Sequence, residues 1–188
     1  MNLFFLYLNK AVHRVILTGM IGEETERMTF REITFADVKR LGEILSSGEA
    51  MRYYPKVLDR KGVEEWIART RREYREWGYS FWGCYLKEGD VFVGVCGLHF
   101  HADIGGKEEI ELAYLFDPQW WGKGLASEAA RQAMDYAERK LNQKRLISLI
   151  RPENGPSCRL AERNGLTVEQ KIHFWGQPHL VYTTQLSG

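Results

Sequence analysis

The sequence contains few cysteines, and their positions do not suggest a disulfide framework or a metal centre. Cys84, Cys96 and Cys158 lie far apart, and the first two fall in apolar runs, where a free thiol behaves as a small buried hydrophobe. The five histidines show no metal-ligand spacing apart from the pair His99 and His101, for which the sequence offers no third ligand. These absences predict a protein without a bound metal.

A long hydrophobic run is also missing. The apolar stretch from Leu3 to Leu8 is much shorter than a membrane-spanning helix. It is accompanied neither by a basic leader nor by a small-residue cleavage site, so it does not have the pattern of a secretion signal. We therefore expect a cytoplasmic protein that has no membrane partner.

An excess of charge of one sign is equally absent, because 26 basic side chains balance 25 acidic ones to a net charge of +1. One segment does collect arginines, namely Arg69, Arg71, Arg72 and Arg75. Glutamates interleave with them at helical spacings, namely Glu64, Glu65, Glu73 and Glu76. This alternation is typical of a solvated helix face rather than of a surface that binds nucleic acid, so no nucleic-acid partner is expected.

The chain has the size and the apolar content of one domain with a sizeable core, with 188 residues of which 44% are hydrophobic. Apolar alternation predicts strands at residues 27–33, 80–86, 91–100, 108–116, 145–150, 167–175 and 179–186. Apolar residues at helical spacing predict helices at 34–45, 59–77, 124–141 and 156–163. Turns are expected at "KEGD", "DIGGK" and "GQP". This order predicts an α/β (α+β) fold in which an antiparallel meander is followed by a crossover to a parallel strand.

The most informative stretch is "FDPQWWGKGLASEAARQAMDYAERKL", residues 116–141, in which two tryptophans and two glycines precede a long helical pattern. Glycine allows a tight turn and a close approach of the backbone to a ligand, and the first amides of a helix have no partner within it. Together these features favour an anion site for a ligand that carries phosphate. In isolation, a glycine pair before a helix is more often a simple turn, and the Walker pattern G-x-x-x-x-G-K-[ST] is absent.

Several segments resemble the GCN5-related N-acetyltransferase (GNAT) family, and within it the branch that acetylates protein N-termini, ribosomal proteins among them. "ELAYLFDPQWWGKGLASEA" is similar to the fourth strand and the Q-x-x-G-x-G/A acetyl-CoA loop of that branch, and "RPENGPSCRLAERNGL" is similar to its N-x-x-S and E-K-x-G-F segment. "TERMTFREIT", "YSFWGCYLKEGDVFVGVCGLHF" and "WGQPHLVY" follow the order of the family. The resemblance predicts an N-terminal extension at residues 1–26 and an acetyltransferase domain at residues 27–188.

The resemblance implies a mixed, mostly antiparallel sheet that is splayed between its fourth and fifth strands, with acetyl-CoA as the cosubstrate in the gap. It assigns Leu115 and Phe116 to the pantetheine arm and acetyl group, and Asn154 to a hydrogen bond with that arm. The residues implied to surround the pyrophosphate through their backbone amides are Trp121, Gly122, Lys123, Gly124, Leu125 and Ala126. Aligned amides and the helix dipole can hold an anion without a fixed side-chain charge, although Lys123 is positioned to add a contact. Trp120 is expected to be a packing residue.

Acetyl transfer to an amine requires a neutral nucleophile, stabilisation of the developing oxyanion and a proton for the departing thiolate. Glu111, in the strand that should carry acetyl-CoA, is the candidate base. It can equally be an outward-facing residue that alternates with Glu109, the weaker candidate. Ser157, in the N-x-x-S segment, is the candidate proton donor or, alternatively, a cap of the short helix. Many members of the wider family use a tyrosine in that helix, but the matching residue here is Ala161.

The predicted protein is an N-acetyltransferase that acts by direct attack of a primary amine, with a protein N-terminus as the first candidate acceptor. Two alternatives stay open: an acetyltransferase for a small amine (polyamine, amino sugar or antibiotic), and a non-catalytic acyl-CoA-binding module. An acyl-cysteine route through Cys158 is not favoured, because no histidine supports it in the sequence. The first helices, the last hairpin and the pair His99 and His101 are expected to line the acceptor groove, which His179 and Tyr182 would close. We expect a monomer or a homodimer.

Overall fold

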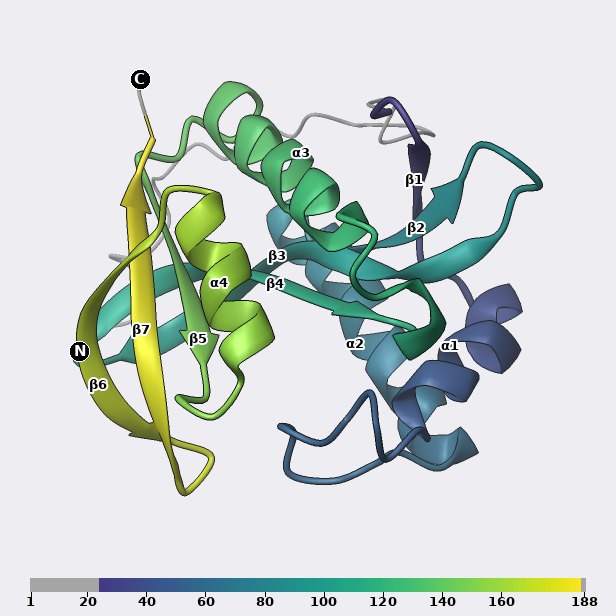
Figure 1. Cartoon of the computed structure of the whole chain (residues 1–188), viewed down its shortest axis with the longest axis horizontal. Coiled ribbons are helices and arrows are strands. Elements are labelled where there is room, and N and C mark those ends of the chain that lie inside the picture. Colours follow the sequence, from purple (N-terminus) through teal and green to yellow (C-terminus); the bar gives the residue numbers. More distant parts are fainter. Residues whose placement is uncertain (1–23, 187–188) are drawn as a thin grey trace, which may run out of the picture.

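The computed structural model describes residues 24–186, in which a mixed sheet carries helices on both faces (Figure 1). The strands are β1 (Met28–Glu32), β2 (Phe81–Leu86), β3 (Phe92–Ile104), β4 (Lys107–Phe116), β5 (Arg145–Ile150), β6 (Thr167–Phe174) and β7 (Gln177–Gln185). The helices are α1 (Val38–Leu45), α2 (Arg60–Trp77), α3 (Leu125–Arg139) and α4 (Gly155–Arg163). Two 3-10 turns are η1 (Phe35–Asp37) and η2 (Pro118–Trp120). This arrangement confirms the predicted α/β (α+β) fold class.

The sheet splits at one pair of neighbouring strands. Its strand order is β1-β2-β3-β4-β5-β7-β6, and within residues 24–186 only β4 and β5 pair in parallel. These two strands share one register pair, Glu111 with Ile147, whereas β3 and β4 are paired along most of their length. Figure 1 shows β5 leaving β4 at a steep angle. The sheet is therefore splayed between its fourth and fifth strands, as the resemblance implied.

Local hydrogen bonds set the ends of the first helices. Thr34 and Asp37 form a reciprocal capping box before α1, in which the carboxylate of Asp37 accepts the amide of Thr34 at 2.8 Å. The Asp59 carboxylate accepts the amide of Gly62 at 2.8 Å where α2 begins. Gly78 ends α2 with a φ of 80°, a left-handed conformation that glycine adopts without strain. The sequence pattern had predicted both ends of α2.

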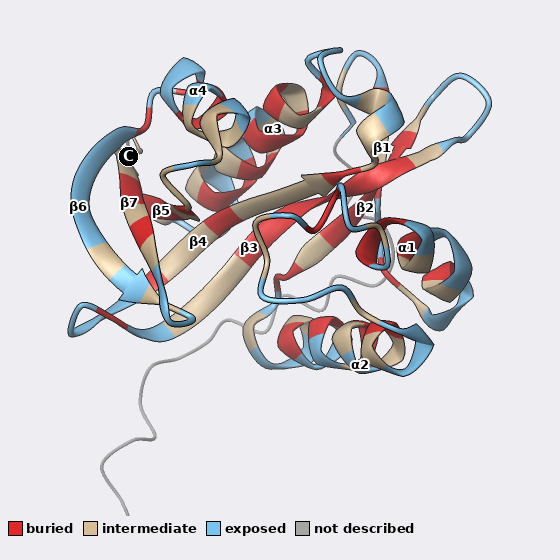
Figure 2. Cartoon of the chain, turned by 60° about the horizontal axis from the view of Figure 1, so that its bottom comes forward, coloured by how far each residue is buried: buried red, intermediate tan, exposed pale blue. Residues whose placement is uncertain are grey.

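Side-chain alternation along β4 separates two cores. Leu112 and Phe116 pack with α3 in one core, whereas Leu115 packs with α1 and α2 in the other. Figure 2 shows α3 and α4 on one side of the sheet and α1 and α2 on the other, with β6 largely exposed. Even-numbered residues of β4 therefore face α3 and α4, and odd-numbered residues face α1 and α2.

One residue of the charged helix α2 that the sequence pattern assigned to solvent is buried. Glu73 was expected on an exposed charged face, but it is only 4% exposed, so that expectation is wrong. It falls at helical spacing on the inward stripe that also carries Val63, Ile67 and Thr70. The hydroxyl of Ser80 donates to its carboxylate at 2.5 Å, which compensates part of the cost of burying a charge.

The last hairpin turns earlier than the sequence pattern predicted. The turn was expected at "GQP", but β7 already begins at Gln177, which pairs with Phe174. Trp175 and Gly176 make the turn instead, with φ values of 51° and 70°. A two-residue turn with both residues in the left-handed region matches the twist of the flanking strands, so it replaces the longer turn.

The packed part of the chain already includes residues just before Arg27. Glu24 forms a β-bridge with Thr29 and an ion pair with Lys87 at 3.0 Å. The domain boundary at residue 27 stays a prediction, and the remainder of the expected extension, residues 1–23, lies outside the described part of the chain.

Candidate active site

Side-chain hydrogen bonds replace the backbone ladder where β4 and β5 separate. The Ser148 hydroxyl donates to the carbonyl of Leu112 at 2.7 Å, and the amide of Leu149 donates to Oε1 of Glu111 at 3.3 Å. Beyond this point, residues 113–116 pair with β3 on one side only, so their other backbone edge is open to a ligand. The predicted cofactor residues on this open stretch are Leu115 and Phe116.

The loop after β4 has the geometry of an anion site. Gly122 and Gly124 adopt φ values of 74° and 78°, which other residues reach only with strain. Gly124 is the N-cap of α3 and supplies no side-chain cap, so the first amides of the helix, including those of Leu125 and Ala126, have no partner within it. Among residues 24–186, no atom outside the immediate loop lies within 4 Å of a Cβ built on Gly122. The loop therefore offers open space, free amides and the positive end of a helix dipole.

Arg27 holds this loop in place from the far end of the sheet. Its Nη1 donates to the carbonyl of Lys123 at 2.9 Å, and its Nε donates to Oε2 of Glu128 at 2.7 Å. Burial alone would raise the pKa of Glu128, but hydrogen bonds from Thr25 and Arg27 outweigh burial and lower it. The sequence does not predict this contact of Arg27, because no local pattern links residues 101 positions apart.

The two tryptophans of the loop are fixed by hydrogen bonds and packing. The indole N–H of Trp121 donates to the carbonyl of Phe116 at 2.8 Å, and its backbone amide donates to the carbonyl of Pro118 at 3.1 Å. The Trp121 amide is thus engaged within the loop, which leaves the amides that follow it for a ligand. Trp120 packs against the core on the α3 side, and the ammonium of Lys123 lies 4.2 Å from the centre of its ring, a cation–π contact.

The short helix α4 presents Ser157 at the split. Oδ1 of Asn154 accepts the amide of Ser157 at 3.2 Å, so Asn154 rather than Ser157 caps the helix. The Ser157 hydroxyl has no hydrogen-bond partner among residues 24–186 and is not one of their fully buried polar atoms, so a ligand can reach it. The hydroxyl of Tyr114 donates to the carbonyl of Ser157 at 3.3 Å, which brings a second hydroxyl to the same turn. Ala161 is buried within α4.

A buried hydrogen-bond network ties α4 to α3. Oδ1 of Asn164, at the end of α4, accepts from the hydroxyl of Ser127 at 2.8 Å and from Nη1 of Arg131 at 3.4 Å. The Asn164 side-chain amide returns a bond to the carbonyl of Ser127 at 3.4 Å. Because buried and satisfied networks are rigid, the loop at the start of α3 and Ser157 on α4 keep a fixed relation.

On the other face of β4, Glu111 pairs with an imidazole. Nε2 of His101 lies 2.7 Å from Oε2 of Glu111, and the two side chains are only 11% and 15% exposed. Oε1 accepts the amide of Leu149, so both carboxylate oxygens are engaged. Glu109, the weaker candidate, is instead held by Arg145, whose Nε lies 3.1 Å from each of its carboxylate oxygens. Glu111 therefore faces the split, whereas Glu109 is taken up by an ion pair.

A second carboxylate–imidazole pair lies beside the first. Nδ1 of His99 is 3.3 Å from Oε1 of Glu73, and the His99 ring meets that of His101 edge-on, with 4.7 Å between ring centres. Burial alone would raise the pKa of Glu73, but its contacts with His99, Ser80 and Arg69 outweigh burial and lower it. Glu73 therefore stays ionised at neutral pH and anchors His99.

Aromatic side chains from two distant segments surround the Glu111–His101 pair. Phe174 meets the His101 ring edge-on at 5.5 Å, and Trp175, in the last hairpin, lies 6.3 Å from the ring of Tyr54 in the loop between α1 and α2. Burial raises the pKa of Tyr54, and the charge of Glu111 raises it further. The first helices and the last hairpin thus meet here, but no local pattern in the sequence identified Tyr54.

The two residues expected to close the acceptor side point in different directions. His179 packs edge-on against Phe174, with 5.6 Å between ring centres, beside the pair described above. Tyr182 belongs to the core beneath α4, and its hydroxyl donates to Glu162 at 3.1 Å. The expectation for Tyr182 is therefore wrong, because residues an odd number of positions apart in a strand face opposite sides of the sheet.

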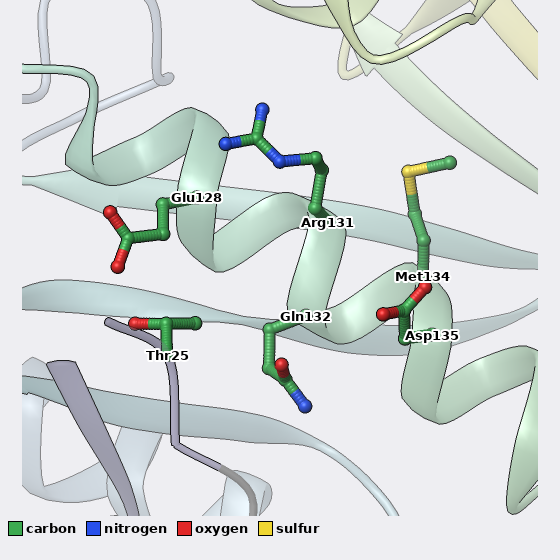
Figure 3. Close-up of a pocket in the computed structure, with 6 residues that line it drawn as sticks. All are labelled: Thr25, Glu128, Arg131, Gln132, Met134 and Asp135. Carbon is green, nitrogen blue, oxygen red and sulfur yellow. The ribbon is translucent and has the colours of Figure 1, made fainter. Parts of the chain in front are cut away.

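A hollow of about 280 Å³ lies beside α3, away from the split (Figure 3). Figure 3 shows the Glu128 side chain extending toward Thr25, in the segment that precedes β1. No residue from β4, β5 or α4 lines the hollow, so the candidate site remains the split itself. Within residues 24–186, no helix is long and apolar enough to cross a membrane, and no group of side chains could hold a metal ion.

The sheet is split at its parallel strand pair, next to a glycine loop that opens a helix, and this arrangement suits a phosphate-bearing ligand placed against an open strand edge. A family model described as "Acetyltransferase (GNAT) domain" matches residues 27–167. The chain belongs to this acetyltransferase family and is an N-acetyltransferase, as the resemblance predicted, and acetyl-CoA is the cosubstrate of the family.

Individual relatives agree with this assignment. The chain is 31% identical over 159 residues to the protein YkkB of Bacillus subtilis, covering 84% of this chain and 92% of that one. It superposes on an acetyltransferase from Agrobacterium tumefaciens with a TM-score of 0.76 and 25% identity, covering 89% of this chain and 95% of that one.

Two structures solved with coenzyme A share the fold at lower identity. RimL, a ribosomal-protein acetyltransferase, gives a TM-score of 0.70 at 17% identity and covers 87% of this chain and 97% of its own. A spermidine N-acetyltransferase from Vibrio cholerae, solved with coenzyme A and spermine, gives a TM-score of 0.70 at 15% identity and covers 86% and 96%. Their acceptors differ, so the fold alone does not identify the acceptor of this chain.

Proposed function

We propose that this protein transfers the acetyl group of acetyl-CoA directly to a primary amine, and that the acceptor is the N-terminal amine of a peptide or protein. The observation that carries the proposal is the position of Glu111. Its carboxylate faces the split at the last contact between β4 and β5, where the open edge of β4 begins.

In the proposed complex, acetyl-CoA lies along the split with its pyrophosphate at the glycine loop. The free helix amides and the open space at the loop support this arrangement. The side-chain NH₂ of Asn154 has no partner among residues 24–186 and can reach the pantetheine arm. The residues proposed to hold acetyl-CoA are Leu115, Phe116, Gly122, Lys123, Gly124, Leu125, Ala126 and Asn154, and Trp121 would contribute its ring rather than its amide.

The proposed reaction divides its proton transfers between two groups. As the amine nitrogen attacks the thioester carbonyl, the C–N bond forms and the C–S bond breaks. Glu111 draws the proton from the amine, directly or through a neighbouring group, and the hydroxyl of Ser157 supplies a proton to the departing thiolate. Each general acid or base of this kind contributes about a hundredfold to ten-thousandfold to a rate.

The charges on the acceptor side favour an acceptor with a single amine over a polyamine. A polyamine carries several cations and is best bound by several carboxylates that have no other partner. Three glutamates, one each on α2, in the loop between α1 and α2 and in the loop before α4, already have partners in the pairs Glu73–His99, Glu49–Arg52 and Glu153–Arg151. The aromatic rings around Glu111 offer an apolar surface that suits the first side chain of a peptide.

A thiol-release assay with acetyl-CoA tests the proposal against a panel of N-terminal peptides, polyamines and amino sugars. We expect turnover on peptides, and slower turnover in Glu111→Gln than in the parent. Faster turnover on polyamines or amino sugars would replace the peptide with a small amine. Tight binding of acetyl-CoA without thiol release on any amine would identify a non-catalytic module.

A further inference from the structure

Within the Glu111–His101 pair, we propose that the imidazole accepts the proton of the acceptor amine and that the carboxylate holds the imidazole in position. The inference rests on the proposed function, because it concerns the same reaction. It makes His101 a catalytic residue and Glu111 a positioning residue.

Each carboxylate oxygen of Glu111 has a nitrogen partner, which fixes the position of the side chain. Oε2 lies 2.7 Å from Nε2 of His101, and Oε1 accepts the amide of Leu149 from the other side of the split. Both carboxylate oxygens of Glu111 thus already have a nitrogen partner, whereas the imidazole has a second nitrogen.

In the Glu111–His101 pair, the atom that can still accept a proton from a ligand is a nitrogen of the imidazole. Nδ1 of His101 has no hydrogen-bond partner among residues 24–186, yet it is not one of their fully buried polar atoms, so a ligand or water can reach it. Nδ1 of His99, by contrast, is fully buried. The ring of His101 is fixed by edge-on contacts with His99 at 4.7 Å and with Phe174 at 5.5 Å.

Elementary acid–base chemistry favours the same assignment. A base works best when its pKa lies near the working pH, and an imidazole ordinarily titrates near pH 6.5, whereas a glutamate carboxyl titrates near 4.3 (both approximately). A fixed carboxylate beside the ring orients the imidazole and stabilises the imidazolium that forms. A carboxylate–imidazole unit thus suits removal of a proton from an amine at neutral pH.

The proton balance of the proposed step closes through solvent. As the amine nitrogen forms its bond to the acetyl carbon, its proton moves to Nδ1 of His101, directly or through one water. The thiolate released by C–S cleavage takes its proton from Ser157, whose hydroxyl then regains a proton from solvent. The imidazolium keeps its Nε2–H bond to the carboxylate of Glu111, and the proton on Nδ1 then passes to solvent.

Four variants test the inference: His101→Ala, His101→Gln, Glu111→Gln and the double variant Glu111→Gln/His101→Gln. His173→Gln is the matched control, because it removes an exposed imidazole from β6 on the opposite face of the strand from Phe174. We expect kcat to fall about a hundredfold or more in both His101 variants, with little change in KM for acetyl-CoA, and to fall less in Glu111→Gln. The double variant should be no slower than His101→Gln alone, because the two groups act as one unit. Added imidazole should restore part of the activity of His101→Ala, and His173→Gln should stay within about threefold of the parent.

The outcomes separate this inference from the proposed function. A large loss in Glu111→Gln together with a small loss in both His101 variants would make the carboxylate the base and overturn the inference alone. Losses in His101→Ala that imidazole does not restore, with a changed KM for acetyl-CoA, would also overturn it by assigning His101 a structural role. Failure of the parent protein to release thiol with any amine would instead overturn the proposed function.

Discussion

Nη2 of Arg27 lies 2.6 Å from Oε2 of Glu128, so the residue just before β1 is clamped to the first turn of α3. We expect Arg27→Met, which keeps the length of the side chain, to weaken coenzyme A binding three- to tenfold, because one hydrogen bond is worth about 0.5–1.5 kcal/mol. Calorimetry with coenzyme A measures the change. Arg31→Met is the control, since Arg31 lies four residues further along, in β1, but pairs with Asp90. Equal affinities of the two variants would contradict the role of the clamp.

Truncation tests the same clamp together with the domain boundary. A chain that begins at Met20 should keep coenzyme A binding and turnover, whereas a chain that begins at Met28 lacks Arg27 and should bind more weakly. Collapse of the fold on truncation to Met20 would show that the preceding residues belong to the domain.

A side chain at Gly124 should interfere with the anion site. Gly124→Ala forces alanine into the left-handed region at a cost of about 1–2 kcal/mol and brings its Cβ within 3.5 Å of Nη2 of Arg27. Gly89→Ala imposes the same strain at a φ of 75° in the turn between β2 and β3. We expect similar losses of stability in both variants, but a loss of coenzyme A affinity of about tenfold, or 1.4 kcal/mol, only in Gly124→Ala. An equal loss of coenzyme A affinity in both variants would exclude a specific role for the loop.

Two hydroxyls, those of Ser157 and Tyr114, lie at the first turn of α4, and replacing each in turn tests which one gives a proton to the thiolate. Ser157→Ala should lower kcat by about a hundredfold while KM for acetyl-CoA changes little. Tyr114→Phe removes the hydroxyl that donates to the Ser157 carbonyl but leaves the serine hydroxyl intact, so it should have a much smaller effect. The reverse ranking in single-turnover kinetics would assign the proton transfer to Tyr114.

The buried carboxylate of Glu73 predicts a dependence of stability on pH. Because its pKa is lowered in the folded protein, Glu73 contributes stability above the ordinary glutamate pKa, and this contribution is lost as the pH falls through the lowered value. We therefore expect the free energy of unfolding to decline less steeply below about pH 5 in Glu73→Gln than in the parent. Denaturant unfolding at several pH values measures the slope. Glu76→Gln, on the exposed face of the same helix, should keep the slope of the parent.

Replacement of Trp175 should stabilise the protein and weaken its binding of the acceptor. It holds a φ of 51° in a two-residue turn, a strained conformation for an aromatic residue, and Asn-Gly is the sequence that such turns prefer. Trp175→Asn should raise the free energy of unfolding by about 1 kcal/mol, because asparagine tolerates the left-handed region. It should also raise KM for the acceptor, since the ring facing Tyr54 is lost. A lower stability of this variant would show that the ring packs favourably enough to outweigh the strain.

The strands, the helices and the glycine loop could be predicted because their signals are local. Alternation, caps and glycines act over a few residues, and β5 and the end of α4 occur where the sequence pattern predicted them. The burial of Glu73 could not be predicted in the same way, since the charge pattern of its helix is the same whether one of its glutamates faces Ser80 or water.

The pairing of Glu111 with His101 depends on register, which the sequence does not show directly. The turn at residues 105–106, continued without interruption, would set His99 opposite Leu112. A bulge before the turn shifts the pairing by one residue, so that His99 lies opposite Glu111 and His101 becomes the diagonal neighbour. The alternation of apolar residues is consistent with this register, but the bulge itself has no clear signal in the sequence.

The pleat of β4 has a consequence for how the acceptor preference of this protein can change over evolution. Glu111 faces α1, α2 and the last hairpin, whereas Tyr114 faces α4 and the turn that carries Ser157. In the proposed complex, the strand would therefore separate the side that selects the amine from the side that holds the thioester. Substitutions in the loop between α1 and α2 or in the last hairpin can reshape the amine pocket while the network between α3 and α4 stays intact. Acceptor choice and donor binding are therefore free to diverge independently, although they meet across the thickness of one strand.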